Sequence, residues 1–482
     1  MKHSIKHIFV SLSVVLTFSM ASVQVKAQNS TLLFSSDLLP HGNVMNPAFF
    51  PNTPFYLALP GVTLDLSMPV AYSDIFQYDA ANQVTNININ NITDQLMQGN
   101  TFAINPDVYI AGMGIRFGKT FIDMSLQTKV DVSLNAPTGL LTFLNEGNMN
   151  NLGAGNEYYI TDPNILHVTA YMEAGFGIGH TFTLPLGELT AGVRVKLLDG
   201  LADIHTTNTS ARIYTAEDLS AIRADVNYQL GMAGIVGLRQ DSEGHISRGP
   251  ISMPPTNYCV GFDLGARWQW DKLDVAFSVL DLGSRINWNQ NVVNLLPENG
   301  NGASFTFEGL DLNGLIQNGS LDNSFSAQLS DSIAALTNYT IVEGESYWTS
   351  TPTRINLSAF YRPLPLLKVG GVFHGELDRG LNSYNLTTEE IVSTFRQNFT
   401  LMANVNVFDW MEVMAGNTLV SDGNRTTVLN PSVGATISLF RMLQAYFMLD
   451  YISNIYLVDA KAAKLTFGFS IAVPGKKTDR DE

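Results

Sequence analysis

The sequence predicts an all-β protein: a single transmembrane antiparallel β-barrel of about 14 strands, with an N-terminal plug-like segment and long extracellular loops. Three observations lead to this prediction. The chain begins like an exported protein, its later segments alternate apolar and polar residues over long runs, and short connections alternate with long ones. Together these features are typical of barrels in bacterial outer membranes.

The first 27 residues have the order of a signal peptide. The start is basic (KHSIKH), the 14 residues Ile8–Ala21 are mostly apolar, and Val25-Lys26-Ala27 places small residues where a signal peptidase cleaves. The apolar stretch is shorter than the ~20 residues that a membrane-spanning helix needs. We therefore expect residues 1–27 to be removed and the mature chain to begin at Gln28.

Composition limits the partners of the mature chain. Without the leader, 24 Lys and Arg residues face 43 Asp and Glu residues, which leaves a net charge of −19. This argues against nucleic acid as a partner, because phosphate binding needs a basic surface. Cys259 is the single cysteine, so the chain forms no internal disulfide.

Residues 28–54 precede the first strand and show no alternation. Their second half is rich in proline, asparagine and phenylalanine (LPHGNVMNPAFFPNTP). Because proline stiffens the backbone, this segment has two interpretations: a plug inside the barrel, or a periplasmic tail pinned to the barrel rim. The candidate plug residues are Asn46, Pro47, Ala48, Phe49 and Phe50.

The strand pattern is clearest on either side of Asp271-Lys272. Every second residue from Val260 to Trp270 is apolar, and the residues between them are Gly, Asp, Arg or Gln. Side chains of a strand point alternately to its two faces, so one face is apolar. Runs of this length match the ~9–11 residues that cross a bilayer as a tilted strand. We therefore expect lipid, and not a protein core, to cover the apolar face.

The connections give the strand count. Short turns are expected at 118–119, 184–188, 271–272, 363–366, 408–410 and 440–442, and longer polar segments at 135–165, 199–258, 284–353, 378–395, 421–430 and 454–463. With a first strand near 56–68 and a last near 464–473, the count is 14 within two. An even count puts both termini on one side, the periplasmic side in outer-membrane barrels. The barrel then spans 55–474, and residues 475–482 form a charged tail.

Parity along the strands places charged residues of both signs inside the barrel. The principal candidates are Glu173, Arg194, Lys196, Asp263, Arg267 and Asp274. One interpretation is a set of ion pairs that brace the strands, and this is the favoured one. The other is a polar conduit, since lumen residues decide what passes through a barrel.

No motif for catalysis, a cofactor or a metal is present. The glycines of AGFGIGH (174–180) lie in a long alternating strand, and no helix follows, so they do not fit a nucleotide-binding loop. None of the mature histidines pairs with another at metal-ligand spacing. We expect a non-enzymatic protein without cofactor. A barrel hydrolase is the least favoured alternative, and His167 and His374 are the histidines to test for it.

Several segments resemble a known family. The NPA sequence of Asn46 to Ala48, with residues 265–288, 305–315 and 354–371, is similar to a Bacteroidota family of outer-membrane barrels known as a domain of unknown function. The wider resemblance is to the superfamily of long-chain fatty-acid transporters. This resemblance implies a place in the cell outer membrane and passage or binding of hydrophobic small molecules. It also implies an alternative, a scaffold or shuttle in protein secretion or surface attachment of the type IX kind.

Overall fold

The computed structural model describes most of the chain after the expected leader. The described residues are 30–51, 53–79, 84–87, 89–98, 100–137, 139, 141, 157–161, 165–215, 222–240, 246–252, 256–297, 303–307, 339–378, 394–408, 410–422, 425–440, 442–450, 452 and 459–473. The expected signal peptide (1–27) and the charged tail (475–482) lie outside them. No helix in these ranges has the length and apolar content of a bilayer-spanning helix.

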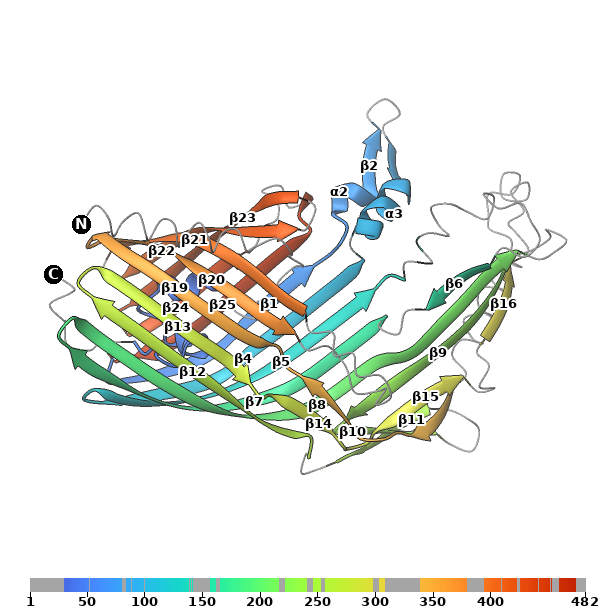
Figure 1. Ribbon diagram of the computed structural model, residues 1–482, viewed down its shortest axis with the longest axis horizontal. Coiled ribbons are helices and arrows are strands. Elements are labelled where there is room, and N and C mark those ends of the chain that lie inside the picture. The colour runs from blue at the N-terminus through green and yellow to red at the C-terminus, as the bar shows by residue number, and fades with distance from the viewer. Residues whose placement is uncertain are drawn as a thin grey trace.

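Fourteen of the described strands form one closed antiparallel barrel (Figure 1). In chain order they are β1 (Phe55–Ser67), β4 (Thr101–Phe117), β5 (Thr120–Asn135), β7 (Leu166–Leu184), β8 (Gly187–Thr215), β12 (Tyr258–Trp270), β13 (Leu273–Leu282), β19 (Thr353–Leu364), β20 (Leu367–Asp378), β21 (Thr394–Phe408), β22 (Met411–Asp422), β23 (Arg425–Leu439), β24 (Leu443–Asp450) and β25 (Ala462–Ala472). Each pairs with the next, and β1 pairs with both β4 and β25, which closes the ring. The predicted fold class and the predicted count of 14 are confirmed.

The two faces of each strand separate as the alternation predicted. In β12, Val260, Phe262 and Leu264 are about half exposed, whereas Gly261 and Asp263 between them are buried. The same inversion holds around the ring, where Phe176, Phe277, Leu401, Val433 and Phe469 are exposed and polar residues point inward. An outer face of this kind is stable only next to lipid, since a large apolar surface in water is unfavourable.

The connections confirm part of the expected pattern and correct the rest. Short turns join the strands at all six expected places, and the barrel ends Phe55 and Ala472 lie at the same edge as these turns. The expected long segment at 421–430 is wrong, because β22 and β23 continue their pairing up to Asp422 and Arg425. The expected segment 199–258 is largely strand, since β8 continues to Thr215 and pairs there with β9 (Ile222–Gly234). Chain length and polarity alone did not reveal that these strands extend beyond the lipid-facing band.

Smaller elements lie at and beyond the end of the barrel opposite the short turns (Figure 1). A sheet extends β8 and β9 with β6 (Glu157–Thr161), β15 (Val293–Pro297), β16 (Ala303–Phe307) and β17 (Tyr339–Glu343). Two-stranded pairs form from β10 (Val236–Gln240) with β11 (Ile246–Ile251), β14 (Arg285–Trp288) with β18 (Tyr347–Ser350), and β2 (Phe76–Asp79) with β3 (Val84–Ile87). Two helices, α2 (Tyr72–Ile75) and α3 (Ile89–Gln98), flank the last pair.

Candidate functional site

The candidate site is the part of the lumen near the short turns, which the N-terminal segment occupies. We call residues 30–54 the plug. It contains two short 3-10 helices, η1 (Thr31–Ser35) and η2 (Pro40–Val44), and every residue of both is buried. The segment therefore lies inside the barrel and not as a tail on its rim. Successive 3-10 turns have no regular apolar stripe, so the path of the segment could not be read from periodicity.

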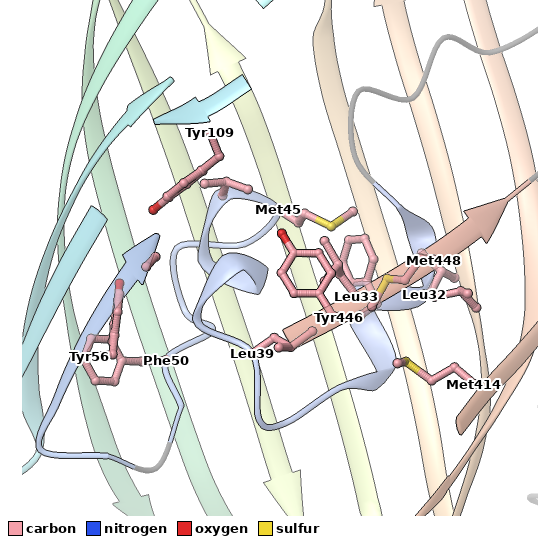
Figure 2. Close-up of a cluster of buried hydrophobic side chains, with 14 of the residues drawn as sticks. Leu32, Leu33, Leu39, Met45, Phe50, Tyr56, Tyr109, Met414, Tyr446 and Met448 are labelled. Carbon is pink, nitrogen blue, oxygen red and sulfur yellow. The ribbon is translucent and has the colours of Figure 1, made fainter. Parts of the chain in front are cut away.

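The plug and the wall share one apolar cluster (Figure 2). Leu32, Leu33 and Phe34 of η1 are between 0 and 4% exposed. Wall residues of the cluster are Tyr56, Ala58, Tyr109, Phe121, Phe360, Val372, Met402, Met414, Tyr446, Met448 and Ala472. Burying one large apolar side chain contributes roughly 1.5–3 kcal/mol, so this cluster stabilises the plug in the lumen.

A cluster of charges holds the plug at the edge with the short turns. Nη2 of Arg267 donates to Oδ1 of Asp37 at 2.5 Å, Arg362 donates to the other oxygen, and Nζ of Lys368 lies 3.3 Å away. We call these four residues the Asp37 cluster. Burial on its own would raise the pKa of Asp37, but the three cations outweigh it and hold that pKa well below its usual value. Arg267 also forms an ion pair with Asp274 at 2.5 Å.

The candidate motif Asn46-Pro47-Ala48 lies against β8, β12 and β13. The Asn46 amide donates to the carbonyl of Phe277 at 3.1 Å, and its oxygen accepts from the backbone N–H of Ala48 at 2.8 Å. A Cβ at Gly265 would come within 2.0 Å of that oxygen, so the close approach requires glycine. The asparagine thus closes a turn in the plug and fixes this turn to the wall.

The two phenylalanines of the motif have different surroundings. Phe50 is buried against Phe121, with ring centroids 4.5 Å apart, and beneath the guanidinium of Arg116. Phe49 is partly buried, and the guanidinium of Arg267 lies 5.2 Å from its ring centroid. Both rings therefore join the apolar cluster to charged residues of the wall.

Four of the charged wall candidates lie in the middle of the lumen and are 0 to 2% exposed. Nζ of Lys196 lies 2.9 Å from Asp263 and 3.5 Å from Glu173, and Glu173 also binds Lys129 at 2.9 Å. Arg194 forms an ion pair with Asp123 and donates to the carbonyl of Asn43 in the plug at 2.8 Å. These charges pair with one another across strands, and Arg194 links them to the plug.

Two important acids were missed by the sequence reasoning. Asp281 accepts from Lys196 at 2.7 Å and pairs with Arg354, yet alternation from Asp274 points it outward. The pairing of β12 with β13 shifts register near residue 281, whose φ is +59°, so Leu280 and Asp281 are both buried. Asp37 was also missed. It is the single Asp, Glu, Lys or Arg between residues 28 and 64, and that isolation was the available signal.

The two histidines to be tested for hydrolysis each contact a polar side chain of the wall. Nε2 of His167 lies 2.7 Å from Oγ1 of Thr169, which itself donates to Asp203 at 2.6 Å. Nδ1 of His374 lies 2.5 Å from the side-chain oxygen of Asn356. Within the described ranges, no group of three His, Cys, Asp or Glu side chains has a metal-binding arrangement.

Comparison with known proteins now adds the family. A family model described as "Family of unknown function (DUF5723)" matches residues 47–450. The chain belongs to this family. The matched range of this DUF5723 protein begins at Pro47 in the plug motif and includes most of the barrel strands. No curated protein matches it in sequence.

Solved structures similar to the DUF5723 barrel are distant. The toluene transporter TbuX of Ralstonia pickettii is 9% identical with a TM-score of 0.41, covering 91% of this chain and 95% of that one. A Pseudomonas aeruginosa FadL homologue is 13% identical, also with a TM-score of 0.41, covering 93% and 99%. The toluene transporter TodX of Pseudomonas putida is 10% identical with a TM-score of 0.38, covering 94% and 98%.

Proposed function

We propose that this protein is an outer-membrane barrel, without enzymatic activity, that binds or passes hydrophobic small molecules. In this proposal the short turns and both termini face the periplasm, and the long connections face outward, as in other outer-membrane barrels. The partners are the lipid bilayer and an apolar ligand.

The observation that carries the proposal is the apolar lining beneath the plug. Phe121, Phe360, Met402, Met414 and Met448 point from the wall into the lumen, where a channel for ions or sugars would present polar groups. A plug that leaves must be replaced by something that covers this lining, because each exposed side chain costs roughly 1.5–3 kcal/mol. An apolar molecule satisfies that condition, and methionine side chains adapt to ligands of different shape.

A thiol cross-link between plug and wall tests the proposal. In a Cys259→Ala background, Ser36→Cys and Glu412→Cys place two thiols where Ser36 now donates to Glu412 at 2.8 Å. A short bifunctional reagent would join them and hold the plug in the lumen. The matched control joins Thr400→Cys to Thr418→Cys, two wall positions on neighbouring strands.

The readout is protein-dependent uptake of an apolar fluorescent dye by Gram-negative cells that carry the protein in their outer membrane, because the lipopolysaccharide layer slows the entry of such dyes. We expect the plug–wall cross-link to abolish entry, whereas the wall–wall cross-link leaves it unchanged. Equal dye entry before and after plug cross-linking would overturn the proposal, and so would a complete lack of binding and entry in the uncross-linked protein.

The second candidate function is a scaffold or shuttle in protein secretion or surface attachment. The observation in its favour is the sheet of β8, β9 and their neighbours, which projects far beyond the barrel (Figure 1). An edge strand of such a sheet can pair with the backbone of a partner chain. Co-purification of secretion proteins, lost on shortening β8 and β9 but kept on plug cross-linking, would favour this candidate.

A further inference from the structure

His41 is the one plug histidine, and it lies at an irregular place in the wall. It belongs to η2 and is 2% exposed. Its ring lies between Tyr109 of β4 and Tyr446 of β24, with ring centroids 4.8 and 4.9 Å away. The backbone of Leu59 in β1 lies next to the ring, and in the described part of the chain neither ring nitrogen has a hydrogen-bond partner.

The pairing of wall strands is irregular where His41 meets the wall. Ala58 and Gly61 of β1 pair with Ser470 and Gly468 of β25, and the register shifts between these two pairs. Pro60 lies within the shift and has no N–H to donate to a ladder. The neighbouring strand β4 has its own irregularity between Tyr109 and Ala111. The His41 ring therefore lies next to a stretch of β1 whose pairing with β25 is irregular.

The surroundings of His41 favour a neutral ring. The titratable groups that face it are the phenols of Tyr109 and Tyr446, which carry no charge at neutral pH. β1 contributes only backbone at this point. The charged groups that interact electrostatically with the phenol of Tyr109 are Arg194 and Asp123, which form an ion pair with each other. Burial lowers the pKa of His41 from 6.5 to about 4. An imidazolium enclosed by two phenol rings without a carboxylate against it is strongly disfavoured.

We propose that His41 is a proton-operated latch, which keeps η2 packed against the irregular part of β1 while the imidazole is neutral and releases η2 when the imidazole is protonated. A released His41 reaches water and takes up a proton at its ordinary pKa. The released state thus binds protons more readily than the plugged state, so release becomes easier as pH falls from about 6.5 and levels off below about 4. This proposal does not depend on the identity of any cargo.

Hydrogen–deuterium exchange of the plug in detergent-solubilised protein tests the latch. After correction for the intrinsic pH dependence of exchange, we expect protection of the amides in residues 39–45 to fall by roughly tenfold to a hundredfold between pH 7 and pH 4.5. His41→Phe keeps a neutral ring, and His41→Gln keeps a neutral donor. Both variants should lack this acid-induced loss of protection, and His180→Gln, in the wall at the short-turn edge, should behave as wild type.

Two results would overturn the latch. One is unchanged protection of residues 39–45 in the wild-type protein at pH 4.5, and the other is an acid-induced loss that persists in His41→Phe and His41→Gln. If these variants fold poorly, exchange of the histidine C2 proton in the wild-type chain decides the question. A titration of His41 near its ordinary value of 6.5 in the plugged protein would then reject the proposal. A failure of dye passage would leave this test unaffected.

Discussion

The carboxylate of Asp37 lies 2.5 Å from the guanidinium of Arg267, although 230 residues separate them in the chain. Arg267 also pairs with Asp274 of the neighbouring strand, so the plug acid joins a pair that the wall already contains. When the plug leaves, Asp274 therefore still neutralises part of the positive charge of Arg267 and Lys368. Such an arrangement suits a segment that is held and released, because Arg267 keeps Asp274 as an ion-pair partner after release and its charge is not left unpaired.

Replacing Asp37 tests how strongly this cluster holds the plug. Asp37→Asn removes the charge that Arg362 and Lys368 share and should weaken plug retention by about 1 kcal/mol, because the site is partly exposed to solvent. Amide exchange of residues 31–38 should rise accordingly at neutral pH. Asp271→Asn is the matched control, since Asp271 lies exposed in a turn with positive φ that asparagine also tolerates. Equal exchange in both variants would contradict the role assigned to Asp37.

The same cluster predicts an acid transition separate from that of His41. The pKa of Asp37 is lower in the plugged state than its ordinary value of 3.8, so the unplugged state binds its proton first. The stabilisation is complete above pH 4 and is lost as pH falls below 3.8 toward the lowered pKa. In His41→Phe, plug exchange should rise as pH falls below 4, and this rise should be absent when Asp37→Asn is added. A rise that begins near pH 6 in this variant would show that another group is responsible.

The positions of several of these residues could be predicted from the sequence, because they depend only on the alternation of neighbouring residues in one strand. Asp263 follows an unbroken alternation from Val260, so parity placed it inside, where it is 0% exposed. Asp281 and the bulge in β1 depend on register shifts, which a period of two cannot reveal. The contacts of Asp37 with Arg267 and of His41 with Tyr109 and Tyr446 join residues more than 60 positions apart, through a segment that has only two short 3-10 helices. Only the folded chain shows them.

A side chain at Gly265 should expel the motif turn of the plug. In Gly265→Val, the new Cβ meets the Asn46 oxygen at 2.0 Å and the Pro47 ring at 2.9 Å, and neither has room to move because both are buried against the wall. We expect the barrel to form, and exchange of residues 43–50 to increase at least tenfold. Ala266→Val, the next residue on the lipid-facing side, should leave the plug unchanged. Full protection of residues 43–50 in Gly265→Val would show that the contact is not required.

Removing the buried cation Lys196 should destabilise the barrel itself. Its Nζ lies 2.7 Å from Asp281, 2.9 Å from Asp263 and 3.5 Å from Glu173. Lys196→Met leaves these acids with less positive charge in a closed interior, and breaking such a pair costs about 3–5 kcal/mol. The midpoint of urea unfolding in liposomes should fall, and adding Asp263→Leu should recover part of the loss. Lys272→Met, at an exposed turn, is the control. A loss no larger than that of the control would contradict the network.

The outward apolar face gives a final prediction about where lipid ends. Phe277 is 46% exposed in the middle of β13, whereas Phe440 is 94% exposed in the short turn between β23 and β24. If lipid covers the first and water or headgroups the second, Phe277→Arg should destabilise the folded barrel in bilayers by roughly 2–4 kcal/mol and Phe440→Arg by at most about 1 kcal/mol. Urea unfolding from liposomes measures both variants under the same conditions. Equal effects would mean that the two rings have the same surroundings, and the apolar band would then not mark the membrane. A large effect confined to Phe440→Arg would place the band at the turns and would require the barrel to sit differently in the bilayer.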